Sequence, residues 1–522
     1  MKTRRTPVRR AALLGLVATL AATGFLLRSR VVAGPGFPLD DAWIHQTIAR
    51  NLALRGEWAF LAGHPASGST SPLWTLMISI GHRLGTDPVA WADALGVGLL
   101  VLVALAAWSW METRRGAAAL AGLLPALLVL EWHLVWAAVS GMEILLLALV
   151  AVLVLRALDS DPLRPGRIGL LIGAAIWIRP EAVLLMGAGM WRIGLDSSRT
   201  VRQRLGALMR SAGAAAIPFA AYLVFHAAVT GAAWPSTFFA KAAEYAVETR
   251  APLLSRLAEQ AIPPLVGGGA VLLPGVVLLV LEAARAGAWH RMAPLVWVFL
   301  HWSAYAIRLP VVYQHGRYGM PTIPVLFVLG VEGAAAWLES RPLSPPRRLI
   351  GRAWVASALA VSGVFWWLGA GAYAVDVAII ESEMVAASRW IAGHTEPGAQ
   401  VAAHDIGALG YFGDRAILDL AGLASPEVIP FLRDEGRLAE YLDERGADYL
   451  MTFPGWYPEL TARAEPIFAT GAPHSPAAGG ENMVVYRWRS GAFSPPRTAV
   501  LYSSAGEPAR RASGNDRHPD RR

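Results

Sequence analysis

Residues 37–56 read FPLDDAWIHQTIARNLALRG and place two adjacent carboxylates, Asp40 and Asp41, directly before a helical pattern. Apolar side chains after the pair recur at helical spacing, which predicts an amphipathic helix over 42–55. Capping the first turn of that helix needs only one aspartate, and Asp41 is the better placed of the two. The second carboxylate therefore points to binding or catalysis, and the chain around the pair indicates which.

The composition is typical of a membrane protein. Of the 522 residues, 55% are hydrophobic and 16% are charged, whereas soluble domains carry about 25% charged residues. Many apolar runs approach the roughly 20 residues that a helix needs to cross a bilayer. The chain contains no cysteine, which excludes disulfides and thiol chemistry. If the predicted helix follows the membrane surface, its apolar face lies in the interface.

Apolar segments recur along the first 375 residues, and we expect about eleven of them to cross the membrane. The predicted fold class is therefore a polytopic α-helical membrane protein. Two short segments flank Arg179-Pro180, so they form either one bent span or a broken pair. The expected spans are 11–27, 88–111, 117–137, 141–157, 167–178, 181–195, 211–229, 264–284, 292–307, 319–338 and 353–373.

Basic residues near the spans predict the orientation, because cytoplasmic loops carry an excess of Lys and Arg. With the N-terminus in the cytoplasm, the inner segments hold 21 Lys and Arg and the outer loops hold 11. This asymmetry accounts for much of the net charge of +8 without a nucleic-acid partner. The first outer loop, 28–87, then carries the acidic pair outside, and it does so even if the first span is a cleaved signal peptide.

The composition changes near residue 376, which predicts a transmembrane domain, 1–375, followed by an outer domain, 376–490. The outer domain holds 17 acidic and 8 basic side chains, a net charge of −9. Short β-like runs alternate there with helical stretches, which predicts a small extracytoplasmic α/β domain. Residues 491–522 are rich in Pro, Ser and Arg and are predicted to be disordered. The β-like runs are 401–405, 416–420, 448–453 and 483–488.

A carboxylate at the outer membrane face is costly unless it binds or reacts. As a general base, an aspartate takes the proton of an acceptor hydroxyl that attacks an activated sugar. As metal ligands, Asp40 and Asp41 would hold a divalent cation, Mg²⁺ or Mn²⁺, against a leaving phosphate. His45 lies one helical turn after Asp41 and would complete such a site. Both alternatives suit an enzyme whose donor is a sugar on a lipid phosphate.

Motifs in order along nearly the whole chain resemble bacterial GT-C-fold glycosyltransferases. That group includes relatives of the mycobacterial arabinofuranosyltransferases and of the protein O-mannosyltransferase and lipid A aminoarabinose transferase class. The motifs are LDDAWIHQTIARNLALRGEWAF (39–60), GHPASGSTSPLWTLMISI (63–80), SGMEILLLALV (140–150), IRPEAVLLM (178–186), PSTFFAKAA (235–243), HGRYGMPTIPVLFVLG (315–330) and VAAHDIGALGYFGDRAILDLAGL (401–423).

The resemblance implies an inverting sugar transfer from a polyprenyl-phosphate donor to a cell-envelope glycan or lipid acceptor, outside the bacterial cytoplasmic membrane. It also implies that an aspartate of the first outer loop acts as the base. This role falls to Asp40 or Asp41, and Asp40 is favoured because Asp41 is better placed to cap the helix.

A lipid-phosphate donor requires cationic partners, and the expected outer segments supply them. Arg317 lies close to His315 in YQHGRYGMP, and Lys241 is one of only two lysines in the chain. We predict that these residues, together with Arg179, bind the donor phosphate. A snorkelling arginine at the membrane interface is the alternative for Arg317.

Several other polar residues lie near predicted outer ends. An ion pair from Arg179 to Glu143 or Glu181 would satisfy these charges without catalysis, so Glu143 is either structural or part of the acceptor site. His404 and Asp405 close the first predicted strand of the outer domain and are also candidates for contacting the acceptor.

Two other functions are compatible with the sequence. A transporter or lipid flippase shares the polytopic pattern, although we see no paired repeats with matching interrupted helices. A non-enzymatic assembly factor on the same fold would use the outer domain to bind a partner. The acidic pair and the cationic loop residues favour the glycosyltransferase.

Overall fold

The computed structural model describes residues 5–61, 63–65, 68–115, 122–339 and 345–491. Residues up to Ser490 form one compact unit. Within the described ranges, six helical segments are long and apolar enough to cross a membrane, so the chain is a multi-pass membrane protein. The six segments are Arg9–Val32, Pro88–Arg114, Val201–Thr230, Gly268–Ala286, Tyr313–Leu338 and Pro345–His394.

Each expected span contains a described helix, but the helices in five of them are shorter than a full crossing. The count of eleven spans therefore stays a prediction. The helices within the eleven expected spans are, in order, α1 (Arg5–Val32), α4 (Pro88–Arg115), α5 (Leu124–Leu130), α6 (Trp132–Ala138), α7 (Ile144–Leu158), α8 (Pro165–Ile176), α9 (Leu185–Gly194), α10 (Val201–Thr230), α13 (Gly268–Ala286), α14 (Ala293–Arg308), α16 (Ile323–Glu339) and α17 (Pro345–Ile380).

Charged residues with extended backbone break the helices at two places, one inside the expected span 117–137 and one between the expected spans 167–178 and 181–195. Between α5 and α6, Glu131 is extended (φ −67°, ψ 118°) and its side chain accepts a hydrogen bond from the Leu134 N–H. Between α8 and α9, Arg179 is extended (φ −156°, ψ 133°) before the 3₁₀ turn η2 (Pro180–Leu184). The two short segments around Arg179 are thus a broken pair, because Pro180 cannot continue the preceding helix.

The last long helix crosses the predicted domain boundary without a break. Helix α17 continues through a π-helical turn, η7 (Glu381–Val385), into α18 (Ala386–His394). Residue 376, where the composition changes, therefore lies inside a helix. Of the residues predicted to be disordered, 491–522, all but Gly491 lie outside the described part of the chain.

The region after α18 contains the predicted α/β arrangement. Its sheet has the strand order β4-β3-β5-β7-β6, in which β3 is parallel to β4 and β5 while β7 is antiparallel to β5 and β6. Strands β3, β4, β5 and β7 fall on the four β-like runs, whereas the edge strand β6 was not predicted. The strands are β3 (Gln400–Ala403), β4 (Ala416–Asp419), β5 (Tyr449–Thr452), β6 (Glu465–Ala469) and β7 (Val484–Arg487).

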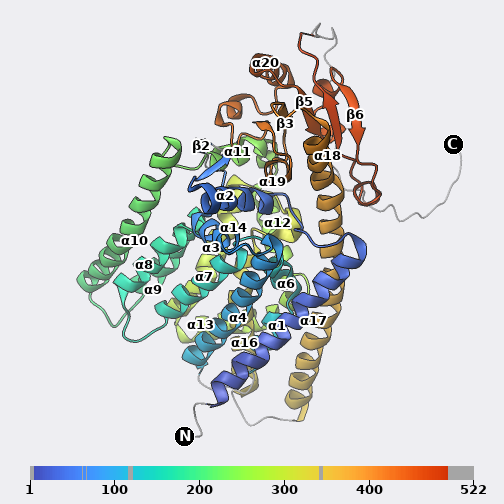
Figure 1. The fold of residues 1–522 in the computed structure, drawn as a ribbon. Helices are drawn as coiled ribbons and strands as arrows, with labels where there is room; N and C mark the ends of the chain where they lie inside the picture. Colours follow the sequence, from blue (N-terminus) through green and yellow to red (C-terminus); the bar gives the residue numbers. More distant parts are fainter. Residues whose placement is uncertain (1–4, 62, 66–67, 116–121, 340–344, 492–522) are drawn as a thin grey trace, which may run out of the picture. The chain divides into compact units, whose positions relative to one another are not determined.

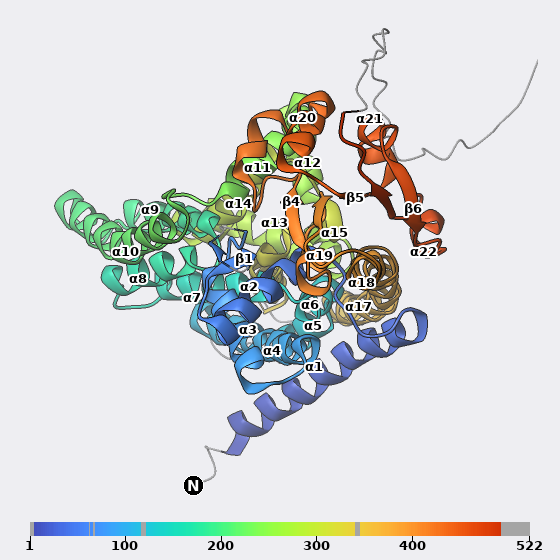
Figure 2. The same ribbon diagram turned by 45° about the horizontal axis from the view of Figure 1, so that its top comes forward.

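The predicted helix after the acidic pair is α2 (Asp41–Arg55), which lies between α3 (Pro72–Leu84) and α19 (Gly407–Phe412) (Figures 1 and 2). Every residue from Ala42 to Ala49 is buried. Protein covers the first half of α2, whereas Leu54 and Arg55 in its last turn are exposed, so the expectation that the helix lies in the membrane interface stays a prediction. Its polar residues find protein partners, as when the Asn51 side chain donates to the Ala59 carbonyl at 2.9 Å.

Candidate functional site

The two aspartates at the start of α2 face different partners. Asp40 is the N-cap residue, and its side chain makes no capping hydrogen bond. Asp41 is the first helical residue, and its carboxylate pairs with Arg317 and Lys241 instead of a backbone N–H of the first turn. The expectation that Asp41 caps the helix is therefore wrong, because stronger cationic partners reach it from distant elements.

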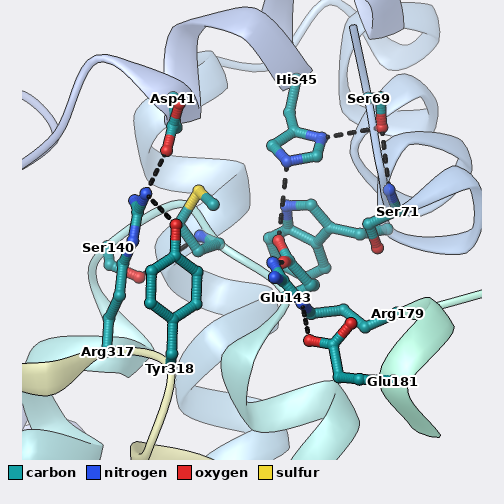
Figure 3. Close-up of polar contacts among 12 residues, drawn as sticks. Asp41, His45, Ser69, Ser71, Ser140, Glu143, Arg179, Glu181, Arg317 and Tyr318 are labelled. Carbon is teal, nitrogen blue, oxygen red and sulfur yellow. Dashed lines mark hydrogen bonds and ion pairs between the residues drawn. The ribbon is translucent and has the colours of Figure 1, made fainter. Parts of the chain in front are cut away.

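Two cations converge on Asp41 and on a neighbouring phenol, and Figure 3 shows one of them, Arg317, between these two groups. Arg317 Nη2 donates to Asp41 Oδ2 and, at 3.1 Å, to the Tyr318 hydroxyl. Lys241 Nζ lies 3.5 Å from Asp41 Oδ2 and 3.4 Å from the same hydroxyl. Burial opposes the charged carboxylate, but Lys241 and Arg317 outweigh it and hold the pKa of Asp41 well below its usual range.

Asp41, Lys241 and Arg317 line a pocket that also reaches Arg179 and the polar loop before α3. Six of its lining residues are Asp41, His45, Thr70, Arg179, Lys241 and Arg317. The Arg317 side chain is 9% exposed, and its Nε and Nη1 are buried without a hydrogen-bond partner in the described structure. A buried guanidinium with unpaired donors suits an anionic ligand, since an unmet donor costs about 1–3 kcal/mol.

The predicted ion pair of Arg179 is present and includes both acids (Figure 3). Arg179 Nη1 lies 2.6 Å from Glu143 Oε1, and Nε lies 2.5 Å from Glu181 Oε1. The Glu143 side chain is 1% exposed, so this pairing explains why a carboxylate is tolerated there. Glu143 also lies 3.6 Å from His45 Nε2 and thereby links the ion pair to α2.

His45 faces hydroxyl groups as well as an acid. Its Nδ1 lies 3.1 Å from Ser69 Oγ and 3.2 Å from Thr75 Oγ1. Among the residues that the structure describes, no group of three or more His, Asp or Glu side chains is arranged to hold a metal ion. The Mg²⁺ or Mn²⁺ site at Asp40, Asp41 and His45 therefore stays a prediction without a matching ligand cluster.

Asp40 faces the C-terminal region. Its two carboxylate oxygens accept hydrogen bonds from the backbone N–H groups of Gly407 (2.6 Å) and Ala408 (2.7 Å). Burial raises the pKa of Asp40 to about 6; the neighbouring charge of Asp41 adds to this shift, and the two amides oppose it. Burial, followed by the charges of Asp40 and Asp41, also raises the pKa of Asp405 well above its usual value.

The other predicted residues are His404 and Asp405, which follow β3, and His315, which lies away from the pocket. His404 follows β3, as Asp405 does, and its Nδ1 lies 2.7 Å from the Tyr457 hydroxyl. His315 does not line the pocket; its Nε2 lies 2.8 Å from Asp376 Oδ2, next to the Trp132 ring. The structure thus groups Arg317, Lys241 and Arg179 around Asp41 and leaves His315 out.

Sequence reasoning missed Tyr318 and two hydroxyl groups that face His45, those of Ser69 in the loop before α3 and of Thr75 in α3. Tyr318 directly follows Arg317, so its position beside a predicted phosphate-binding residue could have identified it. Ser69 and Thr75 lie in the motif GHPASGSTSPLWTLMISI, but their side chains carry no charge that stands out in an apolar chain.

Comparison with solved structures defines the fold. ArnT from Cupriavidus metallidurans in the apo state has a TM-score of 0.55 and 15% identity over 92% of this chain and 98% of that chain. The same protein bound to undecaprenyl phosphate has a TM-score of 0.56 and 14% identity with the same coverage. The Archaeoglobus fulgidus oligosaccharyltransferase tethered with an acceptor peptide has a TM-score of 0.53 and 11% identity over 90% and 73%. The chain is therefore a membrane protein with the GT-C fold.

Comparison at the level of sequence is more limited. A family model described as a domain of unknown function, DUF8728, matches residues 375–490. No curated protein matches the chain. The match covers α18 and the five-stranded sheet, so the C-terminal region corresponds to a sequence domain that other proteins share.

Proposed function

We propose that this protein is an inverting glycosyltransferase that moves a sugar from a polyprenyl-phosphate donor to a cell-envelope glycan or lipid acceptor. The reaction would take place at the outer face of the cytoplasmic membrane, with the N-terminus in the cytoplasm. The excess of Lys and Arg in the opposite segments supports this orientation.

The observation that carries the proposal is the pairing of Arg317 and Lys241 beside the acidic pair, in a pocket at the start of α2. Guanidinium and ammonium groups are the side chains that bind phosphate oxygens. The unpaired Nε and Nη1 of Arg317 supply donors for such a ligand. The GT-C fold adds support, because one neighbour with this fold, ArnT, was solved bound to undecaprenyl phosphate.

In the proposed reaction, the acceptor hydroxyl oxygen forms a bond to the anomeric carbon of the donor sugar. The bond from that carbon to the phosphate oxygen breaks on the opposite face, which inverts the configuration. The electron pair leaves with the polyprenyl phosphate, whose growing negative charge Arg317 and Lys241 stabilise. The hydroxyl proton passes to an aspartate.

We assign the proton to Asp40 and the organisation of the cations to Asp41. A general base works best when its pKa lies near the working pH, and the pKa of Asp40 is about 6. The cations hold the pKa of Asp41 below its usual range, which makes it a weak base. Two carboxylates whose environments separate their pKa values in this way are typical of divided catalytic roles. The capping role of Asp41, which first favoured Asp40 as the base, is not observed, and the separation of the two pKa values takes its place.

The remaining predicted residues have secondary roles in this proposal. Arg179 lines the pocket and would contribute positive charge near the donor, although two acids already pair with it. His404 and Asp405 lie between β3 and α19, whose first amides bind Asp40, so they would contact the acceptor. His315 has no role in donor binding here, because it pairs with Asp376.

The test is to incubate membranes containing the protein with a panel of polyprenyl-phosphate sugars and to identify the products by mass spectrometry. Transfer to an envelope glycan or lipid, absent from membranes without the protein, supports the proposal. Movement of lipid in reconstituted liposomes without sugar transfer would instead indicate a transporter. Neither activity, together with retention of an envelope partner, would indicate a non-enzymatic assembly factor.

A further inference from the structure

The C-terminal region contacts the proposed base directly. Helix α19 begins at Gly407, and the N–H groups of Gly407 and Ala408 each donate to a different oxygen of Asp40, at 2.6 and 2.7 Å. Two hydrogen bonds to separate oxygens fix the rotation of the carboxylate as well as its position. Asp40 is not held by its own helix, because it makes no capping hydrogen bond.

A second residue of α2 holds the other end of α19. Arg50 Nη1 and Nη2 donate to the backbone carbonyls of Tyr411 (2.7 Å) and Gly410 (3.1 Å). The Arg50 guanidinium also lies 4.5 Å from the centroid of the Tyr411 ring. Asp40, the residue before α2, and Arg50 within it therefore bracket α19, because Asp40 binds its first amides and Arg50 binds carbonyls near its C-terminal end.

The contact between the two helices is close. The Trp43 ring packs against the Tyr411 and Phe412 rings, with centroids 4.8 and 4.7 Å apart. A Cβ atom added at Gly407 would overlap the backbone carbonyl of Asp40. Glycine is thus the residue that lets the amides of α19 approach Asp40.

We propose that α19 is a positioning element for the general base, so that the region matched by the domain of unknown function completes the catalytic site of this GT-C protein. Gly407 and Ala408 hold the Asp40 carboxylate toward the acceptor hydroxyl, and Arg50 keeps α19 in place. This inference rests on the proposed function and gives the C-terminal region a direct part in catalysis.

The positioning role differs measurably from a merely structural one. Arg50 and Gly407 are not among the residues that line the donor pocket. Their loss should therefore lower kcat and leave donor binding unchanged. A misplacement of a catalytic group by about 1 Å can cost roughly 10²-fold in rate.

The experiment compares Arg50→Ala and Gly407→Ala with two matched controls in the purified full-length protein. Arg55→Ala removes the same charge from an exposed position of α2, and Gly398→Ala adds a methyl group where nothing lies within 4 Å. We expect kcat to fall roughly 10²-fold in both test variants, with polyprenyl-phosphate binding and monodispersity as in wild type. Arg50→Lys should recover part of the activity, because a single point charge can still reach one carbonyl.

Normal kcat in both test variants would overturn the inference, and so would a joint loss of kcat, donor binding and monodispersity. If the wild-type protein transfers no sugar, the proposed glycosyltransferase function is wrong. If the wild-type protein is active and both test variants keep its kcat, only the positioning role of α19 is wrong.

Discussion

Arg317 donates a hydrogen bond to Asp41 across 276 residues of sequence and thereby joins the start of α2 to the segment before α16. Lys241 reaches the same carboxylate from α11 (Ser236–Glu244). A phosphate that enters this pocket would meet two cations already held in place by an acid. Pairing of this kind keeps the charges satisfied while the site is empty.

Arg317 and Lys241 are therefore expected to dominate donor affinity. Arg317→Ala and Lys241→Ala should each weaken binding of a polyprenyl phosphate by roughly 10- to 100-fold, the worth of one charge-assisted contact. Arg317→Lys should also be impaired if the guanidinium binds two oxygens. Binding to protein in detergent is the measurement, and Arg250→Ala, an exposed change in the segment after α11, is the control. Full affinity in both alanine variants would leave these residues as structural partners of Asp41.

The pH dependence of transfer should report the ionisation of Asp40. The base must be charged, so activity should be full above its pKa and should fall as the pH drops through about 6. Burial raises this pKa most, the charge of Asp41 adds to the shift, and the amides of Ala408 and Gly407 oppose it. The profile of kcat/KM against pH checks it. A lower limb near pH 4, the ordinary range of an aspartate, would contradict the assignment.

A buried charge cluster that includes Glu332 should be essential for stability. Glu332 in α16 is fully buried and binds Arg114 at 2.5 Å and Arg291 at 2.6 Å. Glu332→Ala leaves both cations without this partner and should cost about 3–5 kcal/mol, seen as a large drop in the thermal midpoint in detergent. Glu282→Ala, at an acid that is 41% exposed beside Arg291, should cost about 1 kcal/mol or less. Equal midpoints for the two variants would refute this account of the cluster.

The predicted orientation can be read by labelling single introduced cysteines, since the chain has none of its own. Glu396→Cys and Ser197→Cys lie at exposed positions of the expected outer and inner sides. An impermeant maleimide should label residue 396 in intact cells and residue 197 only after permeabilisation. The reverse pattern would place the acidic pair in the cytoplasm.

Much of the site could be predicted because charged residues are rare in an apolar chain. Asp41, Lys241, Arg317 and Arg179 all stood out for this reason, and the structure brings them together. Their pairing could not be predicted, since Lys241 and Arg317 lie 200 and 276 residues from Asp41. From the spacing alone, the expected role of Asp41 was to cap the helix that follows it.

Other features left no signal of the kind that sequence reasoning uses. The amides of Gly407 and Ala408 are backbone groups, which no side-chain pattern reveals. Glu131 interrupts an apolar run without proline or glycine. Strand β6 contains Pro466 and none of its residues is buried, as expected at a sheet edge, so its pattern did not alternate. The helices themselves were predictable because the apolar runs are long and strongly hydrophobic.

The most direct test of the central claim is sugar transfer and donor binding by purified Asp40→Asn and Asp41→Asn, after monodispersity has been checked. Asn keeps the shape of the side chain but cannot take a proton. Asp40→Asn should lose transfer by roughly 10²–10⁴-fold and still bind the lipid-phosphate donor. Asp41→Asn should lose less and bind the donor at least as well, because Arg317 and Lys241 are freed from their acid. Near-normal transfer by Asp40→Asn together with an inactive Asp41→Asn would reverse the two roles, and near-normal transfer by both variants would contradict the account.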